Sequence, residues 1–228
     1  SSTATGTGIL FAGTINGNYA LTLNVPNGSI QFNQAVGNVT PLSSLVVDTR
    51  ASNVAGSITT SGNLNFNSPI NLSNSAAIDA GGNLSVTGLI TASGNTPAAL
   101  SARGNLTVAD VIANAGISLI SDDILTSGNL DASGVTKGGP ITAIGKNGVQ
   151  AGTLNTSASN GNAGNVLVNS QGNVRLNAVN AQGGNNGAGG SIEISSFQFL
   201  QILGSFIDRN GTNASVSNVG GTSGGPIT

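Results

Sequence analysis

The carboxylates are the side chains of this sequence with the most prospect of catalysis, because the chain contains neither histidine nor cysteine. Asp122 and Asp123 are the only adjacent acidic pair, with Asp110 before them and Asp131 shortly after. Paired carboxylates supply the acid and the base of glycoside cleavage, so convergence of these four would indicate an enzyme or tail-spike-like protein acting on polysaccharide. Adjacent strand residues point to opposite faces, however, and aspartate is typical of turns. We therefore expect that the protein is not an enzyme and has no catalytic residue. The alternative is a β-helix that binds or cleaves polysaccharide.

The sequence indicates no cofactor and no metal site. Thiolate and imidazole ligands are missing, and no segment has the Gly-Gly-x-Gly-x-Asp order of calcium-binding solenoids. The net charge is -2, and the six basic residues are scattered singly, which is not the footprint of a nucleic-acid-binding protein. No apolar run approaches the ~20 residues of a membrane span. We expect no nucleic-acid partner and no membrane span in this segment.

One short phrase, Gly-Asn followed by an apolar/polar/apolar triplet, is repeated through the middle of the chain. Its copies begin at Gly62, Gly82, Gly104 and Gly128, with spacings of 20, 22 and 24 residues. Repeats at such a period predict a solenoid, in which each repeat buries its apolar face against its neighbours. Each period holds three short strand patterns separated by turn residues, too close together for helical crossovers. We predict an all-β fold: a right-handed, three-sided parallel β-helix of about ten coils of roughly 20 to 26 residues.

Equivalent residues of successive coils lie directly above one another in such a fold. The predicted structural ladders are therefore an internal column of leucines and a corner column of asparagines. The leucines are Leu64, Leu84, Leu106 and Leu130, and the asparagines are Asn63, Asn83, Asn105 and Asn129. Asparagine tolerates left-handed backbone geometry, and we expect its amide to bond the amides above and below.

The repeat changes character along the chain without an evident domain boundary. Residues 1–136 carry the Gly-Asn-Leu type of coil, and residues 137–228 carry Gly-Gly phrases followed by β-branched residues, with longer glycine-rich loops such as 180–190. We expect one continuous β-helix over 1–228. The final phrase stops after Ile227-Thr228, where its earlier copy continues into a strand, so we expect the segment to belong to a longer chain.

The richest apolar cluster includes Phe197, Phe199 and Phe206 and departs from the repeat. We expect these rings to fill a wider coil or to cover a core edge. Left exposed, they would instead form an apolar contact patch and mark a binding surface.

The repeats resemble those of filamentous-haemagglutinin-type proteins of bacterial two-partner secretion, with cyanobacterial forms most similar. The resemblance depends on the four Gly-Asn-Leu phrases, on the phrases beginning at Leu21 and Ala35, and on the later Gly-Gly-Pro-Ile-Thr phrases. The secretion domain of that family carries Asn-Pro-Asn-Gly, whereas this chain reads Val25-Pro26-Asn27-Gly28. The resemblance therefore places the segment in the shaft of such a protein.

The resemblance implies a structural shaft of a secreted surface filament or adhesin that mediates cell-surface, cell-cell or substrate attachment. It implies an extracellular location on a Gram-negative-type bacterium and, during export, an outer-membrane β-barrel transporter as partner. A surface glycan or a receptor on a host or neighbouring cell is a further expected partner. Uncapped coils expose strand edges, so end-to-end self-association into a fibre is also expected.

Overall fold

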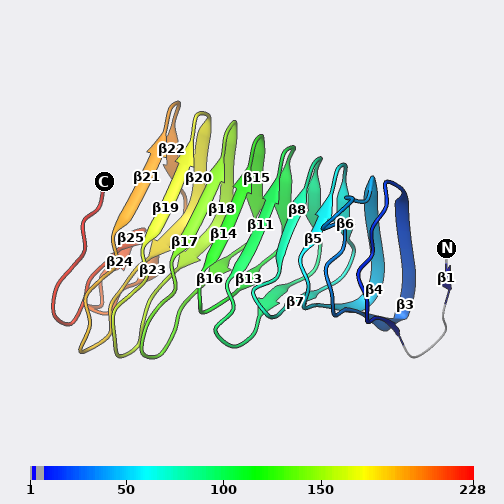
Figure 1. The fold of residues 1–228 in the computed structure, drawn as a ribbon. Helices are drawn as coiled ribbons and strands as arrows, with labels where there is room; N and C mark the ends of the chain where they lie inside the picture. Colours follow the sequence, from blue (N-terminus) through cyan, green and yellow to red (C-terminus); the bar gives the residue numbers. More distant parts are fainter. Residues whose placement is uncertain (1, 4–7) are drawn as a thin grey trace.

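The chain winds into a rod of stacked coils, and its described residues contain no helix (Figure 1). A computed structural model describes residues 2–3 and 8–228. The rod has about nine turns, close to the ten expected. Strands of successive coils pair in parallel and form three rows, which we call faces 1, 2 and 3. The predicted parallel β-helix is confirmed.

Four long strands bend around the corner between faces 1 and 2 and join these two rows into one sheet: β3 (Ala20–Phe32), β4 (Ser44–Val54), β18 (Gly148–Asn155) and β20 (Asn173–Asn180). Face 1 also contains β1 (Ser2–Thr3), β6 (Leu64–Phe66), β9 (Leu84–Val86), β12 (Leu106–Val108), β15 (Ile124–Ser127) and β22 (Leu200–Ile202). Face 2 also contains β2 (Ile9–Phe11), β7 (Ile70–Leu72), β10 (Ile90–Ala92), β13 (Val111–Ile112), β16 (Leu130–Asp131) and β25 (Val216–Ser217).

Face 3 is a separate seven-stranded sheet. Its strands are β5 (Ile58–Thr60), β8 (Ala77–Ala80), β11 (Ala98–Ala102), β14 (Ile117–Ser121), β17 (Ile141–Gly145), β19 (Val166–Ser170) and β21 (Ile192–Ser196). A short antiparallel hairpin, β23 (Phe206–Ile207) and β24 (Asn213–Ala214), departs from the coil pattern between β22 and β25.

The core is a set of apolar columns that run along the rod. Most short strands read inward/outward/inward, so their first and third side chains are buried and the middle one faces solvent. On face 1, Leu45, Leu64, Leu84, Leu106 and Leu125 occupy successive positions of one column, and each is at most 1% exposed. Each such side chain contributes about 1.5 to 3 kcal/mol through apolar burial.

Leu130 does not belong to this column, so its predicted position was wrong. The register places Leu125 over Leu106, and Leu130 lies on face 2 between Val111 and Leu154. The reason is coil length, because Leu125 follows Leu106 by only 19 residues and thereby takes the next place on face 1. A Gly-Asn turn before an apolar strand fits either corner, and the register decides which one it occupies.

Longer coils accommodate their extra residues in loops between faces 2 and 3, and these loops stack on one another. Backbone bridges link Gly134 to Ala158 and Lys137 to Asn162, which lie in successive loops. Glycine is required where the loop backbones meet: a Cβ on Gly164 would lie 2.0 Å from the Gly139 carbonyl oxygen, and one on Gly190 would lie 1.9 Å from that of Gly164. The long glycine-rich loops are therefore ordered layers of the rod.

The Leu106→Ala substitution tests the column of face 1. Leu106 is fully buried, so its truncation should lower the free energy of unfolding by about 2 to 5 kcal/mol through lost burial and a cavity. Thr107 points outward from the same strand, and Thr107→Ala should change this free energy by no more than about 0.5 kcal/mol. Urea unfolding followed by circular dichroism measures both, and equal effects of the two substitutions would contradict the register.

Candidate functional site

The asparagine residues of the corner between faces 3 and 1 form a hydrogen-bonded ladder. The Asn63 Oδ1 accepts the backbone N–H of Asn83 at 2.9 Å, and the Asn83 Oδ1 accepts that of Asn105 at 2.9 Å. The Asn105 Oδ1 then accepts the backbone N–H of Ile124 at 3.2 Å. Each asparagine thus satisfies a corner N–H of the next coil, whereas amide-to-amide bonding was expected.

Glycine precedes asparagine in this phrase because the asparagine side chain of the preceding coil occupies the space where a Cβ would lie. A Cβ on Gly82 would lie 2.5 Å from the Asn63 Oδ1, and one on Gly104 would lie 2.2 Å from the Asn83 Oδ1. The expected left-handed backbone is not found, because among described residues other than glycine only Asn74 and Ser75 have positive φ. The Gly-Asn pair is therefore a packing unit between coils.

Asn129 lies on another corner, so its predicted place in the same ladder was wrong. Its backbone N–H donates to the Asp110 Oδ1 at 2.7 Å, and its own Oδ1 accepts the N–H of Thr153 at 2.8 Å. These three residues form a second ladder at the corner between faces 1 and 2. The register shift that displaces Leu130 displaces Asn129 with it.

The four aspartates considered for catalysis are distributed over different parts of the rod. Asp122 and Asp123 lie at the corner between β14 and β15, and Asp110 lies at the opposite end of face 1, between β12 and β13. Asp131 faces outward from β16 on face 2, where its Oδ1 accepts the Asn155 Nδ2 at 3.1 Å. The structure does not bring these four carboxylates together, and Asp110, Asp123 and Asp131 each bond a residue of the next coil.

Phe197 and Phe199 of the last coils lie on the surface, so the expectation that they fill a wider coil was wrong, and the exposed arrangement given as its alternative is found for these two rings. Phe197 is 87% exposed and Phe199 is 42% exposed, while Phe206 is half-buried in the hairpin. The backbone pairs β22 with β20 in the regular face 1 register, which leaves no wider coil to fill. Phe199 instead packs its ring 5.4 Å from the Arg175 Cζ, in a cation–π arrangement.

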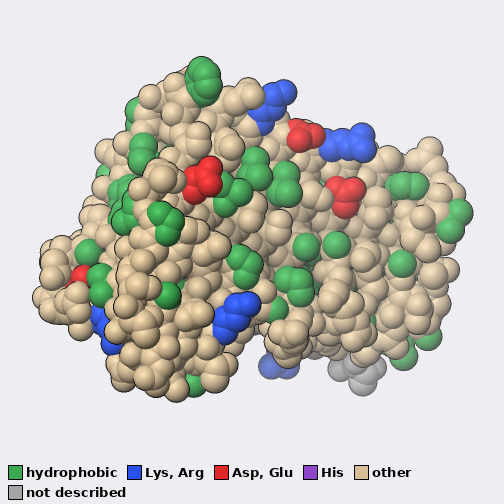
Figure 2. Space-filling model, turned by 60° about the vertical axis from the view of Figure 1, so that its left-hand side comes forward, with side chains coloured by type: hydrophobic (Ala, Val, Ile, Leu, Met, Phe, Trp, Pro, Cys, Tyr) green, Lys and Arg blue, Asp and Glu red, His purple; other side chains and the backbone are tan. Residues whose placement is uncertain are grey.

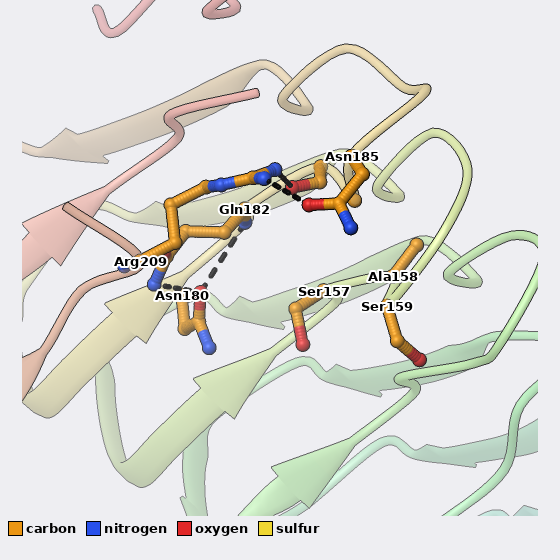
Figure 3. Close-up of a pocket in the computed structure, with 9 residues that line it drawn as sticks. Ser157, Ala158, Ser159, Asn180, Gln182, Asn185 and Arg209 are labelled. Atoms are coloured by element: carbon orange, nitrogen blue, oxygen red, sulfur yellow. Dashed lines mark hydrogen bonds between the residues drawn. The ribbon is translucent and has the colours of Figure 1, made fainter. Parts of the chain in front are cut away.

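A polar hollow of about 370 Å³ opens beside the hairpin, between the stacked loops and the end of β20 (Figure 3). Its walls include Ser157, Asn180, Asn185 and Arg209. Figure 3 shows Arg209 reaching across to Asn185, with the two serines of the earlier loop opposite. Sequence reasoning missed this hollow because Arg209 and the loop residues lie more than 20 positions apart in the chain and no repeat relates them.

Arg209 holds the hairpin onto the rod. Its guanidinium donates to the Gly183 carbonyl and, at 2.6 Å, to the Asn185 Oδ1, and its backbone N–H donates to the Gln182 Oε1 at 2.6 Å. The buried Asp208 supports the turn, because its Oδ1 accepts the backbone N–H groups of Asn210 and Thr212 at 2.9 and 2.8 Å. Most hydrogen-bond donors that line this hollow thus already bond to groups of the protein. We call the contacts of Arg209 with Gln182, Gly183 and Asn185 the clamp.

The rest of the surface is sparsely charged. Figure 2 shows few Lys, Arg, Asp and Glu side chains on a mostly uncharged face; toward its top an acidic side chain lies beside basic ones, and small apolar groups are scattered over the rest. No three His, Cys, Asp or Glu side chains of the described residues lie close enough to hold a metal ion. Within the same residues, no helix is long and apolar enough to cross a membrane.

Comparison of the chain with protein-family models, with curated proteins and with solved structures found no match.

Arg209→Ala tests the clamp. Loss of the two guanidinium contacts should open the hairpin locally and raise amide hydrogen exchange over residues 208–212 by about tenfold, because the lost bonds to a charged donor stabilise only this segment. Exchange in β18 should stay unchanged. Arg103→Ala, at an exposed corner, is the matched control, and equal exchange of the hairpin in the two variants would contradict the clamp.

Proposed function

We propose that the chain is a structural shaft of a secreted bacterial surface filament or adhesin. One observation carries the proposal: the same three-sided coil is stacked without interruption over about nine turns, and its core is continuous from Leu23 to Ile192. The resemblance of the repeats to filamentous-haemagglutinin-type proteins supports the same role. We propose with it an extracellular location and export through an outer-membrane transporter.

The stacking of coils suits a rigid spacer. Backbone hydrogen bonds between coils run along the rod axis, so every coil adds about 4.8 Å of length and is linked to its neighbours on three faces. The asparagine and glycine ladders at the corners repeat the same contact from coil to coil. Such a rod holds whatever it carries at a fixed distance from the cell, and its length is set by the number of coils.

Removal of one whole coil tests the proposal that this part of the rod acts as a spacer. Deletion of residues 64–83 in the natural protein joins Asn63 to Leu84, which restores the Gly-Asn-Leu phrase and places Leu84 over Leu45. We expect the variant to fold, to reach the cell surface and to support attachment as the natural protein does. Thermal unfolding by circular dichroism and an attachment assay on whole cells measure the two properties.

Deletion of residues 64–73 is the control, since half a coil moves the strand residues of one face onto another. This variant should lose cooperative unfolding and surface display, because a register error exposes the apolar columns. Loss of attachment by the whole-coil deletion, with folding and display intact, would contradict a spacer role for this part of the rod.

A further inference from the structure

One coil of face 1 lacks an outward side chain where its neighbours have one. Ile124, Gly148 and Asn173 occupy successive positions of an outward column, so Gly148 leaves a gap between two side chains. A hollow of about 300 Å³ opens there. A Cβ on Gly148 would have no neighbour closer than 3.7 Å, so the backbone does not require glycine at this position. Glycine inside a strand often marks a place where a ligand approaches the backbone closely.

The adjacent outward column supplies polar groups to the same hollow. Gln150 and Arg175 follow one another in register and both line the hollow. The Arg175 guanidinium stacks on the Phe199 ring and makes no hydrogen bond or ion pair with the described residues. A second hollow of about 160 Å³ lies beside Gln150, Arg175 and Leu203. We call the two hollows together, defined by Ile124, Gly148, Gln150, Asn173, Arg175 and Phe199, the face 1 groove.

An unsatisfied acceptor lies in the wall of this groove. The Oδ1 of Asn173 is buried and accepts no hydrogen bond from the described residues. A buried acceptor without a donor costs roughly 1 to 3 kcal/mol. A ligand hydroxyl that donates to this Oδ1 would remove the cost.

The backbone and the side chains that line the groove indicate which class of ligand it binds. The strand beneath it, β18, is paired on both sides, with β15 and with β20, so the floor of the groove offers no free backbone edge to an extended peptide. The two hollows are lined by a guanidinium, one half-exposed aromatic ring and four side-chain amides. The Nδ2 of Asn147 and that of Asn177 already donate to Asp123 and Thr153, so Gln150 and Asn173 are the amides that we assign to the ligand. A guanidinium binds carboxylate or sulfate in a forked geometry, amides bind hydroxyls, and an aromatic ring offers an apolar face to the C–H groups of a sugar.

We propose that the face 1 groove binds an acidic glycan, with its anionic group on Arg175, a sugar ring against Phe199, and hydroxyls on Gln150 and Asn173. The site lies on the side of the shaft and outside the coil removed in the deletion above, so it goes beyond the shaft role and can fail independently of it. A rod with such a groove contributes binding of its own.

Binding of purified chain to immobilised polysaccharides tests the proposal, with polygalacturonate as the carboxylate probe, dextran sulfate as the sulfate probe and dextran as the neutral control. We expect binding to at least one acidic polymer, weakened by salt, and at least tenfold weaker binding to dextran. Arg175→Ala and Phe199→Ala should each weaken acidic-polymer binding by about tenfold or more. Arg103→Ala and Phe197→Ala are matched controls, because neither residue lines the groove.

The Gly148→Thr substitution tests whether glycan binding can be lost while the fold stays intact. The added Cβ meets no atom closer than 3.7 Å, and threonine favours strands, so the unfolding temperature should stay the same or rise while binding is lost. Failure to bind either acidic polymer, equal binding to dextran, or full binding by both Arg175→Ala and Gly148→Thr would overturn the proposal. Preference between the two acidic polymers identifies the anionic group.

Discussion

Backbone hydrogen bonding between successive coils determines which residue lies on which throughout this molecule. Because the strands pair in parallel, each residue contacts its equivalent one turn away, for example Leu64 beneath Leu84 and Leu84 beneath Leu106. Like residues therefore stack in columns, and one unsuitable residue affects the coils on both sides of it. The buried leucine column, the asparagine ladder and the glycine contacts of the loops are three consequences of this pairing.

The same constraint makes departures from the repeat informative. A coil can tolerate a missing outward side chain, as at Gly148, because the core and the backbone pairing are unaffected. It can also accept extra residues at a corner, provided that the loops stack, as those around Gly139, Gly164 and Gly190 do. The hairpin that carries Arg209 is an addition of this kind, fixed to the loop below it by side-chain hydrogen bonds. Binding chemistry on such a rod can vary from coil to coil without a change of fold.

The sequence was sufficient to predict the architecture because its period is explicit. Apolar/polar/apolar triplets after turn residues gave three strands per turn, and Leu64, Leu84 and Leu106 stack as expected. The positions of Leu130 and Asn129 were wrong because coil length varies, and a short coil lets a different segment take the expected place.

The surface was harder to predict than the core. Exposure of Phe197 and Phe199 depends on how the last coils pair, which composition alone does not indicate. The face 1 groove is defined by a missing side chain at Gly148 and by residues about 25 positions apart, so only the register between coils brings them together. The ladder role of asparagine depends likewise on a contact with the following coil.

The central claim, that stacking of coils turns this chain into a shaft, predicts a specific relation between chain length and rod length. Electron microscopy of the native secreted protein, combined with its denatured mass, measures this relation. The account predicts thin rods with about 4.8 Å of length for each coil of roughly 22 residues. A compact particle, or rods that lengthen by 1.5 Å or more per residue, roughly the rise of a helical filament, would contradict it.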